Sequence, residues 1–173
     1  MTDNEKFLTN EEYATLVEAA HDYSLRHGFT VYLIGQTGLK RNEAANFTPE
    51  WFDPEQQIVT VPHEQDEWRP AKPHAARRIP LSTSTAENIA KYIERLDSSV
   101  FRVSGAAIYH RVITAGEHAG IDRVSPNRLR HTYARRLHNT SLSTETISEI
   151  MGLRLETVTA SKTIYGAHPS VLV

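Results

Sequence analysis

Apolar residues near the start of the chain recur at the spacing of an amphipathic helix. Thr9 and Glu12 stand three residues apart, which is the spacing of a capping box, and they precede apolar side chains on one helical face. The next run, FTVYLIGQT at 29–37, is apolar nearly all round, so it predicts a buried helix that Gly38 ends. Its β-branched residues leave a buried strand as the alternative.

Two later segments have the composition of strands. QQIVTVP at 56–62 and ARRIPL at 76–81 are short and have strand-like composition, and together they predict one antiparallel hairpin. The connection between them, HEQDEWRPAKPHA, is long and polar and contains two prolines. We therefore expect a mobile loop there and not a tight turn.

The second half of the chain has further helical signals. Ser84 and Glu87 have capping-box spacing before an apolar helical face, and Ser125 followed by Pro126 is typical of a helix start. Other helices are predicted over 41–46, 105–119, 143–151 and 156–164. The pattern predicts a mixed α/β fold, mainly α-helical with one small antiparallel β-sheet. With no internal repeat and no linker composition, we expect a single domain over residues 1–173.

Composition narrows the class of protein. The chain has 173 residues, of which 39% are hydrophobic and 23% charged, as in an ordinary globular domain. No apolar run approaches the roughly 20 residues that cross a bilayer, and the polar N-terminus does not have the pattern of a secretory signal. We expect a cytoplasmic protein that does not contact the membrane.

The residue types also exclude several chemistries. With no cysteine, the chain has no disulfide framework, no thiolate zinc site and no cysteine nucleophile. The nine histidines are scattered without an HExxH pattern, GQTGLK lacks the spacing of a phosphate loop, and there is no GxSxG elbow. We predict no metal and no cofactor.

Charge is distributed unevenly, although the net charge is only -2. The first 68 residues carry thirteen acidic and four basic side chains, whereas residues 101–140 contain seven arginines and no lysine. Guanidinium suits two-pronged contact with phosphate better than ammonium does. We interpret the arginine-rich segment as a face that contacts an anion; the alternative is a solvated basic surface.

Four motifs follow one another along the chain: TGLKRNE at 37–43, ARRIPL at 76–81, SPNRLRHTYA at 125–134, and IMGL at 150–153 with a later tyrosine. Their order resembles the catalytic domain of the tyrosine recombinase (phage integrase) family, whose motifs are TGLRxxE, the strand ending the catalytic-lysine hairpin, HxLRHT and LGH…Y. The resemblance runs from residue 8 to residue 169. It implies an integrase catalytic-domain fold and DNA strand transesterification through a 3'-phosphotyrosyl intermediate.

The resemblance assigns roles to individual residues. Tyr165 matches the nucleophile, Arg130 the second arginine of the site, and Lys72 the lysine that protonates the leaving oxygen. Glu43 matches the acid three residues after the first arginine, and His131 matches the histidine that supports the site. Such a set is what the chemistry needs, because a tyrosine hydroxyl attacks phosphorus while fixed cations stabilise the pentavalent transition state.

Three positions depart from the family pattern. Lys40 stands where the first arginine is expected, and Arg41 follows it, so Arg41 is a hypothetical substitute for the missing guanidinium. Asn127 replaces the histidine of HxLR, and Leu153 replaces the histidine or tryptophan after the glycine. Lysine keeps the charge but not the planar contact with phosphate, and asparagine can donate a hydrogen bond but cannot transfer a proton.

The resemblance also implies partners. We expect double-stranded DNA as the substrate, a monomer in isolation and a tetramer on DNA. Family members usually carry a separate N-terminal helical domain that clamps DNA, and because this chain begins where the catalytic domain begins, we expect that core-binding domain to be absent. The side chains predicted to contact DNA are Arg77, Arg78, Arg128, Arg135 and Arg136.

Two other interpretations stay open. The departures at Lys40, Asn127 and Leu153 fit a catalytically weakened or inactive DNA-binding protein derived from an integrase. A small helical transcription factor that places its 126–139 helix in a DNA groove is the third candidate, but such a protein has no use for the hairpin that carries Lys72.

Overall fold

The computed structural model describes residues 6–157. Its α-helices are α2 (Asn10–Tyr23), α3 (Leu25–Thr37), α4 (Arg41–Asn46), α5 (Thr83–Arg95), α6 (Gly105–Ala119), α7 (Pro126–His138) and α8 (Thr144–Met151). Its strands are β1 (Phe52–Asp53), β2 (Ile58–Val61) and β3 (Arg77–Pro80), and its 3-10 helices are η1 (Pro49–Trp51), η2 (Pro73–Ala75) and η3 (Ser98–Val100). The predicted fold class, mainly helical with one small antiparallel sheet, is confirmed.

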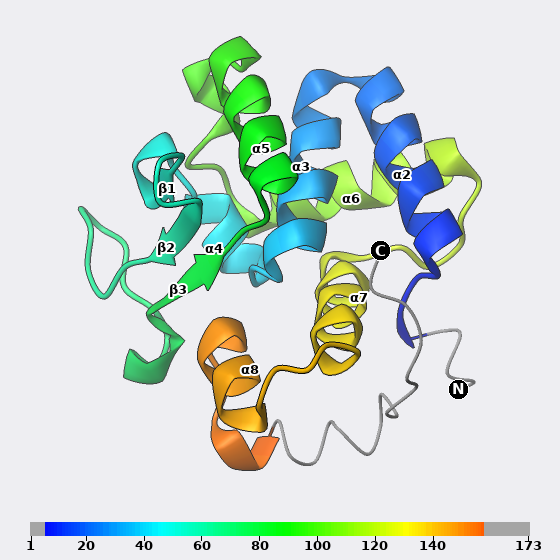
Figure 1. The fold of residues 1–173 in the computed structure, drawn as a ribbon. Helices are drawn as coiled ribbons and strands as arrows, with labels where there is room; N and C mark the ends of the chain where they lie inside the picture. The colour runs from blue at the N-terminus through cyan, green and yellow to red at the C-terminus, as the bar shows by residue number, and fades with distance from the viewer. Residues whose placement is uncertain (1–5, 158–173) are drawn as a thin grey trace.

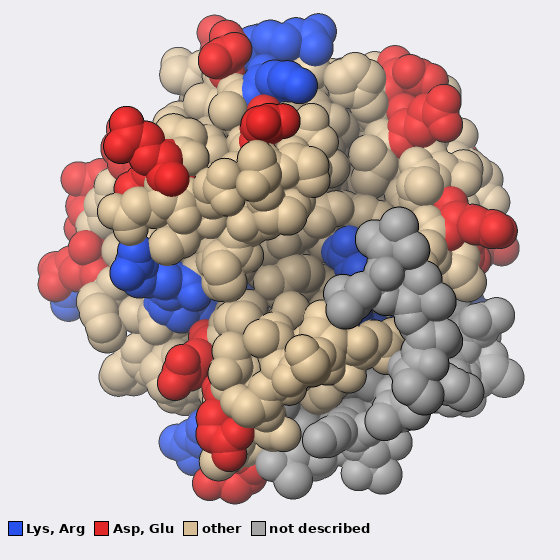
Figure 2. All heavy atoms as spheres, viewed as in Figure 1, with Lys and Arg blue, Asp and Glu red and all other residues tan. Residues whose placement is uncertain are grey.

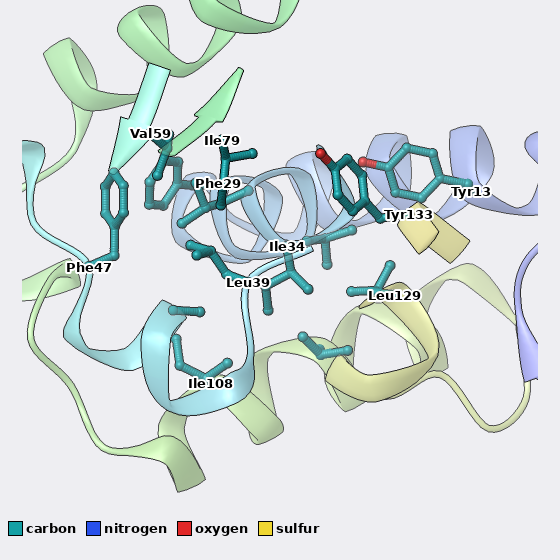
Figure 3. Packing of buried hydrophobic residues seen from close by; sticks show 14 of the residues in the cluster. Tyr13, Phe29, Ile34, Leu39, Phe47, Val59, Ile79, Ile108, Leu129 and Tyr133 are labelled. Atoms are coloured by element: carbon teal, nitrogen blue, oxygen red, sulfur yellow. The ribbon is translucent and has the colours of Figure 1, made fainter. Parts of the chain in front are cut away.

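Helix α3 forms the centre of the molecule. It packs against α2, α5, α6 and α7, and Figure 1 shows it between α2 and α5 with α6 passing behind. Because it is covered on all sides, its sequence is apolar nearly all round, and the strand alternative for 29–37 is wrong. Figure 3 shows Ile34 of α3 among core side chains contributed by the sheet and by α7.

Helix starts follow the local signals with one exception. At α2 the Thr9 hydroxyl accepts from the Glu12 N–H at 3.1 Å and the Glu12 carboxylate accepts from the Thr9 N–H at 2.7 Å, so the predicted capping box is present. The capping box predicted at Ser84 is wrong: α5 begins two residues earlier, where the Ser82 hydroxyl accepts from the Thr85 N–H. Strand β3 ends at Pro80, and Ser82 has the extended backbone of an N-cap.

The predicted hairpin is confirmed and is part of a three-stranded sheet in the order β1-β2-β3. Val59 pairs with Ile79 in the β2–β3 ladder, and both side chains are buried. The two-residue strand β1 was not predicted, because so short a segment has no period that a sequence pattern reveals. Between β2 and β3 the long connection contains the 3-10 helix η2 and a bridge pairing Gln65 with Trp68.

The last described helices lie beside the sheet and below α3. Helix α7 starts as predicted, with the Ser125 hydroxyl accepting from the Arg128 N–H at 3.1 Å and Pro126 in the first turn. Helix α8 packs against β3 and ends at Gly152, which has φ 60°. Residues 155–157 are helical, and the remainder of the helix predicted over 156–164 lies outside the described residues.

Gly38 offers a test of how tightly α3 and α7 are packed. It has φ 65°, and a Cβ added there would lie 2.3 Å from the Tyr133 ring. Gly38→Ala combines left-handed backbone strain with overpacking, so we expect it to lower the free energy of unfolding by about 2–5 kcal/mol in urea denaturation. Gly120→Ala is the matched control, since Gly120 has φ 68° with nothing within 4 Å, and we expect it to cost about 1–2 kcal/mol. Equal losses in the two variants would contradict the packing of Tyr133 on Gly38.

Candidate active site at the start of helix α7

A cleft of about 510 Å³ opens where the α3–α4 turn, α6, the start of α7 and the segment after α8 meet. It is lined by Lys40, Arg41, Tyr109, Ser125, Pro126, Asn127, Arg130 and Leu153. All of these except Tyr109 come from three motifs that are distant in sequence. The fold therefore brings four predicted catalytic residues, Lys40, Arg41, Asn127 and Arg130, together in one cleft.

The α3–α4 turn fixes the backbone of Lys40. Gly38 ends α3 in the left-handed conformation, and its N–H donates to the Ile34 carbonyl. Lys40 then precedes α4 with extended backbone, and its N–H donates to Glu43 Oε2 at 2.8 Å. Because Glu43 closes the turn from inside, the Lys40 side chain is directed to the cleft that it lines.

Glu43 and Arg77 form a buried ion pair beneath the cleft. Arg77 Nη1 and Nη2 donate to Glu43 Oε1 and Oε2, each at 2.8 Å, and the two side chains are only 3% and 4% exposed. The Arg77 Nε also donates to the Ile150 carbonyl at 2.8 Å, and Nη1 donates to the Ala75 carbonyl at 2.7 Å. The pair thus connects α4, β3 and the last turn of α8.

This burial corrects the role predicted for Arg77. Its guanidinium lies inside the protein and is used by internal acceptors, so it does not fit a contact with DNA. The alternating pattern of β3 explains the error, since Arg77 and Ile79 point inward while Arg78 and Pro80 are exposed.

Arg130 is held on the cleft side of α7 by two backbone carbonyls. Its Nη1 donates to the Gly38 carbonyl, and its Nη2 donates to the Met151 carbonyl at 2.8 Å. These contacts join the end of α3 to the end of α8 and orient the guanidinium next to Lys40. A guanidinium fixed at the start of a helix, where backbone N–H groups also point outward, is suited to bind a phosphate.

Asn127 and His131 form a pair one helical turn apart. The Asn127 Nδ2 lies 3.1 Å from the His131 Nε2, and Asn127 is exposed at the mouth of the cleft. Burial and the charges of Arg130 and Lys6 lower the pKa of His131, which favours the neutral ring. The Nε2 of a neutral ring can accept a hydrogen bond from the Asn127 Nδ2, and the Asn127 Oδ1 takes no part in that bond.

The charges around Lys40 act on its protonation. Burial lowers the pKa of Lys40, the Glu43 carboxylate raises it, and the charges of Arg130, Arg77 and Lys72 lower it, so that the net pKa lies below the ordinary lysine value. Burial by itself raises the pKa of Glu43, but the hydrogen bonds and charge of Arg77, the Lys40 N–H and Arg130 outweigh it and lower that pKa. The cleft is thus a positively charged site with one buried counter-charge.

Two of the predicted site residues, Lys72 and Arg41, are exposed cations. Arg41 is the first residue of α4 and lines the cleft beside Lys40. Lys72 is exposed on the β2–β3 connection immediately before η2, close enough for its charge to act on Lys40. The predicted nucleophile Tyr165 lies outside the described residues.

Tyr109 is a cleft residue that the sequence reasoning missed. It is 42% exposed, and it comes from α6, which carries none of the family motifs. On α6, Ile108, Val112 and Ala115 form the buried face, and Tyr109 lies one position away from it. The sequence pattern therefore indicates that Tyr109 is exposed, but it does not indicate that a cleft lies beside it.

The other arginines predicted to contact DNA lie outside the cleft and have internal contacts. Arg78 is exposed on β3 and donates to Gln56, and Arg128 donates to the Asp122 carbonyl at 2.7 Å. Arg135 lies 3.9 Å above the centre of the Phe7 ring. Arg136 donates to the Gly35 carbonyl and lies 5.0 Å from the centre of the Tyr13 ring. Packing of the last two on aromatic rings leaves Arg78 as the most open of the set.

Figure 2 shows that basic side chains border the hollow in the centre of one face, one group of them over the β2–β3 hairpin. Acidic side chains gather toward the edge, including a group over α2.

Within residues 6–157 no three His, Asp or Glu side chains are grouped so as to hold a metal ion. No described helix is both long enough and apolar enough to cross a membrane.

The model of the phage integrase family matches residues 6–162. The chain belongs to the phage integrase family. Tyrosine recombinase XerA of Pyrococcus furiosus is 27% identical over 159 residues, covering 85% of this chain and 53% of that protein, and XerA of Thermococcus kodakarensis is 25% identical over 85% and 54%. The chain therefore spans about half the length of the curated relatives it matches.

Solved structures show the same fold. A crystal structure of XerA recombinase matches with a TM-score of 0.74 and 23% identity, covering 92% of this chain and 59% of that chain. XerH site-specific recombinase bound to palindromic difH substrate, in a post-cleavage complex, matches with a TM-score of 0.69 and 20% identity over 92% and 50%. The integrase catalytic-domain fold predicted from the motifs is confirmed.

The buried pair should dominate stability near the site. Glu43→Gln keeps the shape of the side chain but leaves the Arg77 charge buried without a counter-charge, so we expect the free energy of unfolding at pH 7 to fall by about 3–5 kcal/mol. Glu64→Gln removes the exposed partner of Arg69 and is the control, with an expected loss under about 1 kcal/mol.

The loss of unfolding free energy caused by Glu43→Gln depends on pH. The folded-state pKa of Glu43 is lowered, so its contribution is complete above its unfolded pKa of about 4.3 and is lost as the pH falls through the lower folded value. We expect the gap in unfolding free energy between wild type and Glu43→Gln to be constant from pH 7 to about pH 5 and to narrow below about pH 4. A gap that stays constant under acid conditions would contradict the ion pair.

The lowered pKa of Lys40 is measurable by NMR of its side-chain Cε and Nζ. We expect its titration midpoint to lie below the ordinary lysine value of about 10.4. Glu43→Gln should lower the midpoint further, because it removes the charge that raises it, whereas Arg130→Gln should raise it. Shifts in the opposite directions would contradict the arrangement of charges in the cleft.

Proposed function

We propose that this chain is the catalytic part of a site-specific recombinase that breaks and rejoins duplex DNA through a 3'-phosphotyrosyl intermediate. The observation that carries this proposal is the convergence of Lys40 and Arg130 on one cleft at the start of α7, with Asn127 at its mouth. A phosphate in this cleft meets three cations, Lys40, Arg41 and Arg130, and the N-terminal turn of a helix. The loop that carries Lys72 supplies a fourth cation nearby.

The proposed reaction exchanges one phosphate ester for another. The Tyr165 oxygen forms a bond to phosphorus and its proton passes to water, the bond from phosphorus to the 5' oxygen breaks, and Lys72 donates a proton to that oxygen. Religation is the same sequence in reverse, with the 5' hydroxyl as the nucleophile. The energy of the phosphodiester is kept in the phosphotyrosyl bond, so no external energy source is needed.

The cleft explains how the transition state is stabilised. Charge develops on the nonbridging oxygens of the pentavalent phosphorus, and Arg130 is already oriented toward the site by the Gly38 and Met151 carbonyls. Lys40 supplies charge at the position of the first arginine but without a planar two-pronged contact. Arg41, which lines the same cleft, is the candidate for the second guanidinium.

Double-stranded DNA is the proposed partner. The support is the basic border of the central hollow and the fact that a structural neighbour, XerH, is described as bound to its difH substrate. The proposed reaction places the protein on DNA in the cytoplasm, as a monomer when free and a tetramer when synapsed. Because the acidic segments adjoin the basic face, we expect binding to be weak and to fall steeply with salt.

A denaturation-resistant adduct tests the proposed reaction. The substrate is a pool of nicked duplexes with randomised sequence around the scissile phosphate, labelled at the 5' end, in which the short leaving strand diffuses away and traps the intermediate. We expect the full 173-residue chain to form a labelled adduct, and we expect Tyr165→Phe to abolish it. Tyr109→Phe is the matched control, since Tyr109 lies in the cleft, and it should retain the adduct.

Other outcomes of the adduct experiment would change the proposed reaction or the residues assigned to it. An adduct lost in Tyr109→Phe and kept in Tyr165→Phe would move the nucleophile to α6. Salt-sensitive DNA binding without any adduct would overturn the proposed reaction in favour of a catalytically inactive DNA-binding protein, to which the departures at Asn127 and Leu153 point. If Lys40→Ala abolishes the adduct while Arg41→Ala leaves it unchanged, Arg41 does not replace the missing guanidinium.

A further inference from the structure

We propose that Trp68 is a positioning residue that docks the β2–β3 connection on the core and thereby places Lys72 at the cleft. This inference rests on the proposed role of Lys72 as the proton donor to the leaving oxygen. The connection spans residues 62–76, and sequence alone predicts that it is mobile. Its contacts divide it into two anchored ends with a short segment between them.

The first anchor is an aromatic contact. The Trp68 ring lies against Trp51 with centroids 5.4 Å apart and planes inclined by 56°, and Trp51 is 3% exposed in the core. The Trp68 Nε1 donates to the Pro62 carbonyl at 3.2 Å, so the indole also closes the loop on its own start. A half-buried tryptophan with a satisfied N–H contributes large apolar contact at a low cost in conformational entropy.

The backbone around Trp68 is folded to present the indole. Gln65 and Trp68 exchange two backbone hydrogen bonds, at 2.8 and 3.2 Å, across a turn in which Asp66 has φ 52°. The Asp66 carboxylate pairs with Arg102, which itself has φ 51°. The pair with Arg102 gives this turn a contact outside the β2–β3 connection.

The second anchor lies on the other side of Lys72. Ala75 is 2% exposed, and its carbonyl accepts from Arg77 Nη1 at 2.7 Å, the same guanidinium that pairs with Glu43. Lys72 is four residues from Trp68 and three from Ala75. Since four residues span at most about 14 Å, both anchors together confine Lys72 to a small region.

The confined region is next to the cleft. Ala75, three residues after Lys72, is bonded to Arg77, and the carboxylate of Glu43 that pairs with Arg77 accepts the N–H of the cleft residue Lys40. The charge of Lys72 accordingly acts on Lys40. With the Trp68 ring released, the exposed Asp66–Arg102 pair would be the remaining side-chain contact of the turn, and an exposed pair contributes little. The free segment would then extend toward Pro62 and become up to roughly twice as long. The position of Lys72 would then be averaged over a larger volume, and its proton would reach the leaving oxygen less often.

The first arm of the test measures the position of Lys72 without any DNA. Lys72→Gln removes one of the charges that lower the pKa of Lys40, so the NMR titration midpoint of Lys40 should rise. Trp68→Ala should raise it in the same direction because Lys72 moves away, while Trp68→Phe should keep the wild-type midpoint. An unchanged midpoint in either Trp68→Ala or Lys72→Gln would overturn the positioning of Lys72 by Trp68, whatever the protein does to DNA.

The second arm measures proton donation with a duplex recovered as adduct from the randomised pool. It compares the normal substrate with one whose 5' bridging oxygen is replaced by sulfur, since a thiolate leaves without needing a proton. We expect Trp68→Ala to slow cleavage of the oxygen substrate by a factor between about threefold, from the longer loop, and about a hundredfold, from misplacement by about 1 Å. We expect the sulfur substrate to restore its rate, as it should for Lys72→Ala.

Controls separate this inference from the proposed function. Glu64→Gln changes an exposed residue of the same connection and should cleave both substrates at the wild-type rate. Slow cleavage of both substrates by Trp68→Ala would show an effect through folding or DNA binding and would overturn the inference. Slow cleavage of both by Lys72→Ala would remove the proton-donor role itself, while loss of the adduct in Tyr165→Phe would still support the recombination reaction.

Discussion

The buried ion pair between Glu43 and Arg77 is the constraint on which the site depends. Two charges removed from water are tolerated only if each is fully bonded, and here the carboxylate takes both guanidinium nitrogens and the Lys40 N–H. Arg77 also donates to the carbonyls of Ala75 and Ile150. The turn before α4, the end of the β2–β3 connection and the end of α8 therefore cannot move independently without breaking a hydrogen bond to a buried charge.

That rigidity supports an arrangement of cations that would otherwise repel one another. Lys40 and Arg130 line one cleft, and their mutual repulsion, together with burial, lowers the pKa of Lys40. Glu43 and the carbonyls of Gly38 and Met151 offset the repulsion from the protein side. A site that holds positive charge in place before an anion arrives needs little reorganisation when a phosphate binds, which is the condition for electrostatic stabilisation of a transition state.

The structure shows which contacts are made by two residues that depart from the family pattern, Asn127 and Leu153. Asn127 does not stand alone at the mouth of the cleft but lies within hydrogen-bond distance of His131, whose lowered pKa favours the neutral ring. Leu153 lines the cleft while packing against the core, so it adds an apolar wall where the family pattern has a polar or aromatic ring. In the proposed reaction the proton donor is Lys72, which lies outside the cleft lining, so the placement of its loop matters.

Local signals in the sequence determined most of the helices, because capping and apolar spacing act over a few residues. The Thr9 capping box, the Ser125–Pro126 start and the all-round apolar run of α3 each specify their element without distant contacts, and the order of the motifs determined the family. Tertiary structure alone decided that Arg77 is buried and not exposed on the surface, and that Tyr109 lies in the cleft. The local sequence pattern around Arg77 is the same whether its charge is paired with a carboxylate 34 residues away or hydrated by solvent. The helical pattern around Tyr109 is likewise the same whether or not a cleft lies beside it.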